Sequence, residues 1–475
     1  MSNPTENRIF VGGSFTAART DTRLELVNPA TEETFARVAD CDEADVDGAV
    51  LAAERALPAW RDTPAKERSD LLNALADGIQ ARSAEMDALI TKENGAPAWW
   101  ASFVGSSAHF LYRATAQIAA GYIEEEERES PAGRSLFVNE PVGVVAAIVP
   151  WNSPQVLIAS KLGPALGAGC PVVLKPSPET SLDALMLAEV IEEVGFPPGV
   201  VNVVTGGRDT GAALVRHRGV KKVSFTGSTA AGRWIASVCG EQLKAVSAEL
   251  GGKSAVVLLD DADMDAFAGT VISDVVPYSG QVCYANTRVL VHRSRFEEAL
   301  ECLRSILEKS PVGDPTDPAT VFGPLVTAVQ REKVEGYINS ALADGARLVL
   351  GGGRPGAQAK GYYIEPTIFV DVRPEMRIFQ EEIFGPVLVV LPFADDDEAV
   401  ALANDSDYGL AGAVFGRDVD HATDVARRME TGRITVNAGR GASRFSSLYK
   451  GSGLGSVGDM ALSAYLQPKN IMQPG

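Results

Sequence analysis

Between Val142 and Ala248 the chain alternates short apolar runs with amphipathic stretches of helical length. The expected strands are 144–149, 172–174, 200–204, 222–225 and 245–248, and the expected helices are 155–166, 181–194, 210–217 and 230–242. Strands separated by helices of this length predict βαβ units and a parallel, doubly wound sheet. Ligands of such sheets bind at the carboxyl ends of the strands. The expected binding loops therefore begin at Pro150, Lys175, Gly206 and Gly227.

The flanking segments predict two further parts of the molecule. The first 120 residues are mainly helical by periodicity, most clearly over 42–60 and 65–91. Residues 118–139 break this pattern with the acidic run Glu124–Glu127, which favours a hairpin or arm with a solvated acidic face. A second α/β region extends from Ser254 to about Asn437, and 464–472 is expected to form a closing strand.

The charge balance excludes some partners. The 475 residues include 62 acidic and 43 basic ones, a net charge of −19 that disfavours nucleic acid and anionic membranes as partners. The longest smooth apolar run, 142–149, is far shorter than the roughly 20 residues that span a bilayer. Residues 1–10 lack the apolar segment of a secretory signal, so we expect a cytoplasmic protein.

The five cysteines are widely spaced and odd in number, which argues against a disulfide framework, and we expect no metal site. Cys283 follows Gly280-Gln281-Val282 in a loop, where a thiolate can be accessible enough to act as a nucleophile. The alternative for an isolated cysteine is inert packing, which we expect for the other four.

Two short motifs resemble nucleotide-binding loops. Gly252-Lys253-Ser254 imitates the end of a phosphate-binding P-loop, but a β-like run follows it directly where a helix is required, so we reject that site. The segment 225–232 joins a strand to a helix as a degenerate form of the dinucleotide fingerprint, with a hydroxyl and free N–H groups suited to a pyrophosphate. By itself it fits an ordinary βα turn equally well.

Six motifs then occur in a characteristic order: Pro150-Trp151-Asn152-Ser153-Pro154, Lys175-Pro176-Ser177, Phe225-Thr226-Gly227-Ser228-Thr229, Glu249-Leu250-Gly251-Gly252-Lys253, Gly280-Gln281-Val282-Cys283 and Glu381-Glu382-Ile383-Phe384-Gly385-Pro386. Together they resemble the aldehyde dehydrogenase superfamily, over nearly the whole chain. The resemblance implies an α/β fold with a Rossmann-like cofactor domain (1–119 and 142–250), an α/β catalytic domain (251–442) and a small β oligomerisation arm with the C-terminal tail (120–141 and 443–475).

The resemblance also implies a reaction, the oxidation of an aldehyde to a carboxylic acid with NAD(P)+. Cys283 would be the nucleophile that forms a thiohemiacetal and then a thioester. The Asn152 amide and the Cys283 backbone N–H would stabilise the oxyanion. Glu249 would activate the water that hydrolyses the thioester. Lys161 would support the proton network; its alternative is a helix-surface charge.

For the cofactor, the resemblance implies binding by Pro150, Trp151, Lys175, Thr226, Gly227, Ser228, Leu250, Glu382 and Phe384. Lys175 and Glu382 would bind the two riboses, and Phe384 would pack near the nicotinamide. Many relatives carry Glu three residues after the lysine, where this chain has Pro178 followed by Glu179. A carboxylate there repels a 2′-phosphate. We expect NAD, with NADP as the alternative.

The expected partners are a small aldehyde and further copies of the chain in a homodimer or homotetramer. Glu249 argues against transfer of the acyl group to coenzyme A. A semialdehyde substrate and an inactive scaffold of the same fold stay open as competing interpretations.

An apolar tunnel around Phe103, Phe110, Trp151 and Tyr278 would suit aliphatic or aromatic aldehydes. The segment 445–448 and Val457 depart from the family pattern near the substrate entrance and the proton exit.

Overall fold

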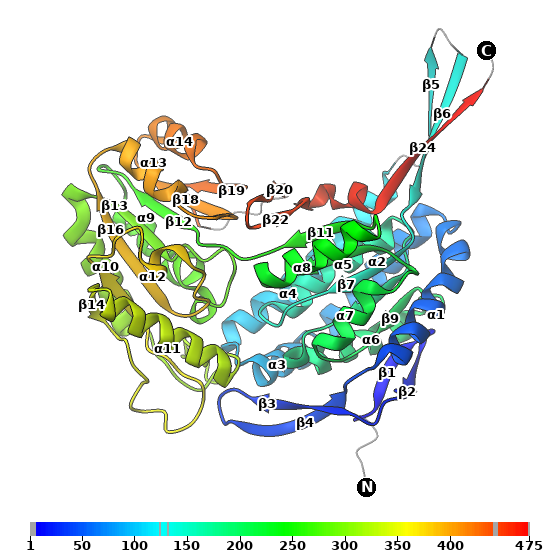
Figure 1. The fold of residues 1–475 in the computed structure, drawn as a ribbon, viewed down its shortest axis with the longest axis horizontal. Helices are drawn as coiled ribbons and strands as arrows, with labels where there is room; N and C mark the ends of the chain where they lie inside the picture. The colour runs from blue at the N-terminus through cyan, green and yellow to red at the C-terminus, as the bar shows by residue number, and fades with distance from the viewer. Residues whose placement is uncertain (1–5, 123–124, 131–132, 440–444, 474–475) are drawn as a thin grey trace.

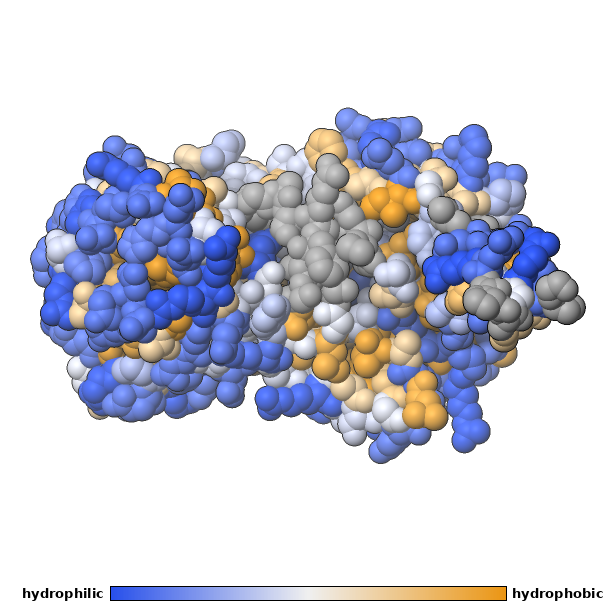
Figure 2. Space-filling view, turned by 90° about the horizontal axis from the view of Figure 1, so that it is seen from above, coloured by the Kyte–Doolittle hydropathy of each residue, from blue (hydrophilic) through white to orange (hydrophobic). Residues whose placement is uncertain are grey.

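The computed structural model describes residues 6–122, 125–130, 133–439 and 445–473. Two lobes, each built on a sheet covered by helices, lie side by side, and a narrow arm projects from one of them (Figure 1). The surface of the left lobe in Figure 2 is mainly hydrophilic, whereas hydrophobic residues gather on the right lobe.

The first sheet has the order β2-β1-β9-β8-β7-β10-β11-β22. Its five central strands are parallel, and the expected doubly wound sheet is confirmed. The strands are β1 (Arg8–Val11), β2 (Ser14–Ala17), β7 (Val144–Ile148), β8 (Val172–Lys175), β9 (Val201–Val203), β10 (Val220–Thr226), β11 (Ala245–Glu249) and β22 (Gly453–Leu454).

Both faces of this sheet are buried, which explains the continuous apolar runs of its strands. Val145 and Ala147 of β7 pack in one core, and Val144 and Ala146 pack in another. The first core is covered by helices that include α5 (Pro154–Gly167) and α6 (Ser181–Val194), and the second by α1 (Glu43–Arg61), α7 (Arg208–Arg216) and α8 (Thr229–Glu241).

The N-terminal region differs from the expectation in two respects. The periodic stretch 65–91 is divided into α2 (Ala65–Ala81) and α3 (Ser83–Asn94) at Arg82, whose φ of −106° and ψ of 16° interrupt the helix. The Arg82 guanidinium there binds Glu85 and Glu189, both at 3.0 Å. Strands β1, β2, β3 (Arg23–Asn28) and β4 (Glu33–Ala39) precede α1, and helix periodicity does not detect them because they are short and largely polar. Helix α4 (Ala98–Ala120) ends the region.

The second sheet has the order β14-β15-β16-β13-β12-β18-β19, and its strands are parallel except for β14. They are β12 (Ala255–Leu258), β13 (Arg288–His292), β14 (Arg347–Leu350), β15 (Thr367–Val370), β16 (Val387–Phe393), β18 (Ala411–Phe415) and β19 (Arg433–Val436). The helices of this lobe are α9 (Met264–Ala268), α10 (Phe296–Lys309), α11 (Ala328–Ala343), α12 (Arg377–Gln380), α13 (Asp396–Asn404) and α14 (Val419–Arg428). The strand β12 follows Ser254 directly, in agreement with the rejection of a P-loop.

The arm is a three-stranded antiparallel sheet of β5 (Glu125–Ser130), β6 (Gly133–Pro141) and β24 (Leu466–Gln473). The hairpin and closing strand predicted from the sequence are therefore present, and Glu125–Glu129 is exposed. Short paired strands complete the structure: β17 (Tyr408–Gly409) with β21 (Tyr449–Lys450), and β20 (Phe445–Ser447) with β23 (Ser456–Gly458). In the described ranges, no helix has both the length and the apolar character needed to cross a bilayer.

Candidate active site

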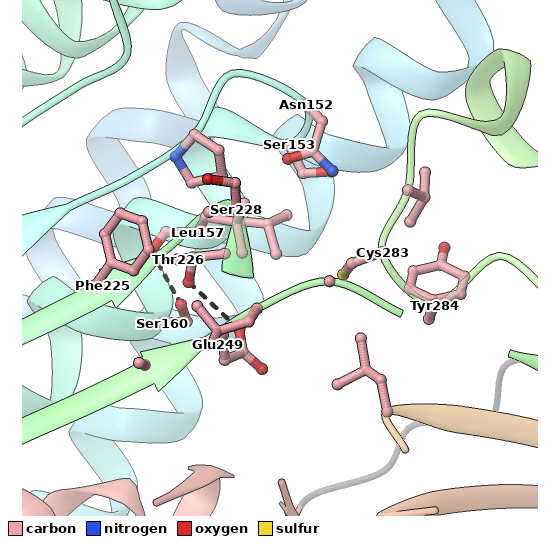
Figure 3. Close-up of a pocket in the computed structure, with 18 of the residues that line it drawn as sticks. Asn152, Ser153, Leu157, Ser160, Phe225, Thr226, Ser228, Glu249, Cys283 and Tyr284 are labelled. Atoms are coloured by element: carbon pink, nitrogen blue, oxygen red, sulfur yellow. Dashed lines mark hydrogen bonds between the residues drawn. The ribbon is translucent and has the colours of Figure 1, made fainter. Parts of the chain in front are cut away.

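A cavity of about 420 Å³ lies where the two lobes meet. On one side it is lined by the loop after β7, the ends of β10 and β11 and part of α5, and on the other by Val282, Cys283, Tyr284, Glu382 and Phe384. Figure 3 shows Asn152, Glu249 and Cys283 on three separate segments around it. The loops at Pro150 and Gly227 line this cavity as expected, whereas Lys175 and Gly206 do not.

Cys283 follows a tightly held loop. Tyr278 and Ser279 have φ values of 46° and 53°, in the left-handed region that non-glycine residues rarely adopt. Two side-chain hydrogen bonds hold the loop: the Tyr278 hydroxyl donates to the Asn94 carbonyl at 2.6 Å, and the Ser279 hydroxyl donates to the Gly323 carbonyl at 2.8 Å. Because surrounding structure holds this conformation, Cys283 occupies a defined position in the cavity wall.

The other cysteines lie elsewhere. Burial raises the pKa of the Cys41 and Cys170 thiols to about 12, which keeps them protonated. Cys239 is buried in α8, and Cys302 is half-buried in α10. Cys283 is thus the cysteine that lines the cavity.

Gly252 fits against the backbone of Cys283. A Cβ on Gly252 would lie 2.2 Å from the Cys283 carbonyl oxygen, far inside van der Waals contact. Its N–H also donates to Glu382 Oε1 at 3.0 Å. The Gly-Gly sequence between β11 and β12 therefore allows this linker to pack directly against Cys283 and Glu382 at the cavity.

Asn152 extends from the loop between β7 and α5 and is 4% exposed. Its side-chain Nδ2 donates to the Gln281 backbone carbonyl at 3.0 Å, and the Asn152 backbone carbonyl accepts from Trp100 Nε1 at 3.2 Å. A side-chain amide carries two N–H groups, so one remains for a ligand in the cavity.

Glu249 ends β11 beside Thr226, its partner in the parallel register with β10. The Thr226 hydroxyl donates to Glu249 at 3.5 Å and accepts from Lys161 Nζ at 2.7 Å (Figure 3 shows the first bond). Lys161 is buried, so it is not a helix-surface charge. Burial lowers the pKa of the Lys161 amine, while the charges of Glu249 and Cys283 act in the opposite direction.

All the residues expected at the cofactor except Lys175 line the same cavity. The Trp151 and Phe384 rings meet edge to face with centroids 5.5 Å apart. Glu382 is half-buried, and desolvation raises the pKa of its carboxyl. Ser228 caps α8, where its hydroxyl accepts from the Ala231 N–H at 3.3 Å. Pro150, Thr226, Gly227 and Leu250 also line the cavity.

Lys175 lies at the end of β8, outside this cavity. Its Nζ donates to the Pro176 carbonyl at 2.7 Å, and burial lowers its pKa to about 8. The negative charge of Glu179 raises the pKa of Lys175, against the effect of burial, so Glu179 lies near Lys175. It does so although it follows Lys175 by four residues, one more than the Glu of many relatives. The Glu179 carboxylate accepts a hydrogen bond from the Ser177 hydroxyl.

These residues fit a nicotinamide dinucleotide. A ribose diol needs a hydrogen-bond acceptor, and Glu382 offers a half-buried carboxylate at the cavity. A pyrophosphate needs unpaired N–H groups, and α8 presents its N-terminus at Ser228. In the parts of the chain that the structure describes, no group of three or more His, Cys, Asp or Glu residues could hold a metal ion.

Two of the four aromatic residues that we expected in the substrate tunnel do not line the cavity. Phe103 and Trp151 line the cavity, but Phe110 is 64% exposed on α4, and Tyr278 is fully buried behind Trp151. Helix periodicity does not show which aromatic residues turn inward. Sequence reasoning also missed Leu111, Val156, Leu157, Val282 and Tyr284, which line the cavity without forming a motif.

Two polar residues of the second lobe were also missed. The Arg433 guanidinium lies over the Tyr284 ring at 5.3 Å, and both residues line the cavity. Gln330 Nε2 donates to the carbonyls of Ile383 and Phe384 at 3.1 and 2.7 Å and so holds the loop that carries Phe384. Of the segment 445–448, Leu448 lines the cavity. The side chain of Val457 lies outside what the structure describes.

The fold and the cavity define a class of α/β proteins. In this class, a doubly wound parallel sheet of the kind that binds dinucleotides and a second α/β lobe enclose a site that contains a cysteine thiol. A family model described as "Aldehyde dehydrogenase family" matches residues 15–471. The chain belongs to the aldehyde dehydrogenase family, whose reaction is the oxidation of an aldehyde to an acid.

The relatives agree with this assignment. The chain is 43% identical over 470 residues to a geranial dehydrogenase of Castellaniella defragrans, with 98% of each chain covered. It superimposes with a TM-score of 0.96 on a Mycobacterium tuberculosis aldehyde dehydrogenase in complex with NAD+ (39% identity; 99% of this chain and 98% of the other). An NAD+ complex of a Bacillus cereus aldehyde dehydrogenase gives the same TM-score at 37% identity, with 99% and 96% covered.

Proposed function

We propose that this protein oxidises aldehydes to carboxylic acids with NAD+ through a covalent intermediate on Cys283. The observation that carries the proposal is the convergence of Cys283, Asn152 and Glu249 on one cavity from three separate segments of the chain. A thiol, an amide donor and a carboxylate are the groups that acyl chemistry on a carbonyl requires.

In the first half of the reaction, the Cys283 thiolate attacks the carbonyl carbon and the carbonyl oxygen becomes an oxyanion. The second N–H of the Asn152 amide and the backbone N–H of Cys283 donate to that oxygen; each such donor typically contributes about 3 kcal/mol. NAD+, when bound, would supply the hydride acceptor for this oxidation. Trp151 and Phe384, whose rings meet edge to face in the cavity wall, would hold the nicotinamide end.

In the second half, Glu249 takes a proton from water, whose oxygen bonds to the thioester carbon. The C–S bond breaks and the Cys283 thiolate is restored. Lys161 and Thr226 hold the Glu249 side of the cavity through their hydrogen bonds. The presence of Glu249 at the cavity supports hydrolysis over transfer of the acyl group to coenzyme A.

For the cofactor we propose NAD in preference to NADP. Glu179 lies near Lys175, where a carboxylate would repel a 2′-phosphate. Pro178 begins the short turn Pro178–Thr180, which carries Glu179 back toward the lysine. Lys175 would bind the adenosine ribose, and Glu382 the nicotinamide ribose.

For the substrate we propose an apolar aldehyde. The cavity is lined by Phe103, Leu111, Val156, Leu157 and Val282, and a 43% identical relative is named for its activity on geranial. A semialdehyde is the second candidate, because the cationic Arg433 also lines the cavity.

We further propose that residues 1–119 and 142–250 form the cofactor domain, 251–442 the catalytic domain, and 120–141 with 443–475 the oligomerisation arm and tail. Residues 440–444, in which one boundary falls, lie outside the described ranges. Exposed Ile471 and Met472 on β24 support association of the arm with another copy, in a dimer or tetramer. A cytoplasmic location stays a prediction.

The test measures NADH formation from NAD+, and NADPH formation from NADP+, with geranial, benzaldehyde, hexanal and succinic semialdehyde. Wild type is compared with Cys283→Ala and with Cys302→Ala, a control cysteine outside the cavity. We expect NADH with apolar aldehydes, loss of at least about 10⁴-fold in Cys283→Ala, and normal activity in Cys302→Ala. Full activity in Cys283→Ala would overturn the covalent mechanism, and a rate confined to semialdehydes would favour the second substrate class.

A further inference from the structure

Two loops from different lobes carry the groups proposed to act on the substrate carbonyl, and both meet the same buried corner of the molecule. Asn152 lies on the loop between β7 and α5, and Cys283 follows the loop 278–282 (Figure 3). The corner is the segment 94–100, which joins the last residue of α3 to the first turn of α4. Side chains of this corner contact both loops.

Asn94 makes one hydrogen bond with each loop. Its side-chain Nδ2 donates to the Trp151 backbone carbonyl at 2.9 Å, directly before Asn152 in the chain. Its backbone carbonyl accepts from the Tyr278 hydroxyl at 2.6 Å. The Asn94 Oδ1 accepts from the Ala96 N–H at 3.0 Å, which fixes the orientation of the amide. Asn94 is fully buried, so water does not compete for these hydrogen bonds.

Trp100 contacts the same two loops. Its indole Nε1 donates to the Asn152 backbone carbonyl at 3.2 Å. Its ring stacks on the Tyr278 ring, with centroids 5.7 Å apart and planes 17° apart. Both rings are buried in one apolar cluster. Two residues of the corner therefore each hold the loop of Asn152 and the loop that precedes Cys283.

The loop before Cys283 depends on this support. Tyr278 has φ 46° and ψ 54°, a left-handed conformation that a bulky residue keeps only when its surroundings impose it. The corner holds both the hydroxyl and the ring of Tyr278. Farther along the loop, Asn152 Nδ2 donates to the Gln281 carbonyl at 3.0 Å. A displacement of Tyr278 would therefore reach the Asn152 amide as well as Cys283.

The corner is itself attached to both lobes. Helix α4 packs against α2 and α5 of the first lobe. On the side of the second lobe, the Ala98 N–H donates to the Pro315 carbonyl at 3.0 Å, and Trp99 Nε1 donates to the Val321 carbonyl at 3.2 Å. Because it is fixed on both sides, the corner can hold the two loops at a constant separation.

We propose that Asn94, Trp100 and Tyr278 are positioning residues that hold the Asn152 amide at its working distance from Cys283. The inference rests on the proposed function, in which this amide donates to the oxyanion of the adduct on Cys283. The described lining of the cavity includes none of the three side chains, so they act through the two loops. A donor of this kind depends on its placement, since a displacement of about 1 Å costs on the order of 100-fold in rate.

The test is a double-mutant cycle between Tyr278→Phe and Asn152→Ala in the full-length enzyme. Tyr278→Phe removes the hydroxyl that donates to Asn94 and keeps the ring that stacks on Trp100. Stopped-flow absorbance measures the rate at which the first equivalent of NADH forms with saturating NAD+ and hexanal. Steady-state kinetics measure KM for both substrates, because a loss of rate at constant KM separates positioning from binding.

A second variant and two matched controls accompany the cycle. Trp100→Phe keeps an aromatic ring but removes the N–H that donates to Asn152. The control for Tyr278→Phe is Tyr112→Phe, a fully buried tyrosine of α4 whose hydroxyl has no hydrogen-bond partner among the described residues. The control for Trp100→Phe is Trp60→Phe on α1, where the buried indole N–H likewise has no partner in the described ranges.

Asn152→Ala is expected to slow the first equivalent of NADH by about 10²- to 10³-fold, the usual effect of losing one oxyanion donor. Tyr278→Phe and Trp100→Phe are each expected to slow it by about tenfold with KM unchanged, which corresponds to a displacement smaller than 1 Å. Adding Tyr278→Phe to Asn152→Ala is expected to cost less than about twofold more, because no amide is left to misplace. Both controls should keep the wild-type rate.

If the losses of Tyr278→Phe and Asn152→Ala multiply in the double variant, the proposal is overturned, because Tyr278 then acts independently of the amide. A wild-type rate in both Tyr278→Phe and Trp100→Phe would overturn it too, as would an equal loss in the two controls. If Asn152→Ala does not fold, Asn152→Ser, which also lacks the amide, takes its place. Failure of the proposed function is distinguishable, since wild type would then form no NADH with any aldehyde.

Discussion

Lys161 Nζ and Thr226 Oγ1 lie 2.7 Å apart and join helix α5 to strand β10 beside the cavity that contains Cys283. Thr226 in turn donates to Glu249, so the carboxylate at the end of β11 is linked to a buried amine on a helix of the neighbouring layer. The link fixes the distance between the helix that follows Asn152 and the strand that carries Glu249. A positive charge is thereby held near both Glu249 and Cys283.

Replacement of Glu249 by Gln is expected to separate the two halves of the reaction. Gln keeps the size of the side chain but cannot accept the water proton. We expect one equivalent of NADH to form at the wild-type rate, followed by turnover slowed by about 10²- to 10⁴-fold. Stopped-flow absorbance measures both phases. Loss of the first equivalent would contradict the assignment of Glu249 to hydrolysis; Glu241→Gln, an exposed site on α8, is the control.

Gly252→Ala is expected to displace the nucleophile. The added Cβ would lie 2.2 Å from the Cys283 carbonyl oxygen, so the Cys283 backbone has to move. A displacement of about 1 Å costs on the order of 100-fold in rate, and we expect kcat/KM to fall by that amount. Gly240→Ala in α8, where the Cβ meets no atom within 4 Å, should keep the wild-type value. Equal kcat/KM for the two variants would refute this role of Gly252.

Glu179→Gln is expected to weaken the discrimination between NAD and NADP. The change removes the negative charge near Lys175 that would repel a 2′-phosphate. We expect KM for NADP+ to fall by about fivefold while KM for NAD+ changes little, because one charge contact in a water-filled site corresponds to about 1 kcal/mol. Steady-state kinetics with both cofactors measure the ratio, and Glu192→Gln on α6 provides the comparison. An unchanged ratio would exclude Glu179 as the determinant.

Asp183 gives a pH dependence to stability. Burial raises its pKa to about 7 in the folded protein, against about 4 for an exposed Asp in the unfolded chain. The folded state therefore holds the proton more tightly, and the contribution of Asp183 to stability is lost as pH rises from about 4 through about 7. Asp183→Asn cannot ionise, so its Tm relative to wild type should rise by several degrees between about pH 5 and about pH 8.

Thermal unfolding at one scan rate across this pH range makes the comparison. The pKa of the neighbouring Glu93 carboxyl is also raised, first by burial and then by the charge of Asp183, so the difference in Tm reports the coupled titration of these two carboxyls. A difference in Tm that stays constant across the range would show that Asp183 does not titrate there.

Local patterns were enough to predict the parallel sheet. Its strands are buried on both faces and read as continuous apolar runs, and the helix over 181–194 was predicted with the bounds of α6. The motifs contain many of the residues that line the cavity, because most of these residues follow a strand whose end reaches it. These features depend on residues close together in the chain, where periodicity and turn chemistry are visible.

The tertiary structure alone decided which side chains turn into the cavity. Phe110 and Phe103 lie on the same helix, yet one is largely exposed and the other lines the site, because helix α4 packs against its neighbours on one face. The link between Lys161 and Glu249, and the pairing of Lys222 with Ser247, likewise join residues that are distant in the chain. Such contacts are set by the register of strands and the packing of layers, which no local pattern in the chain encodes.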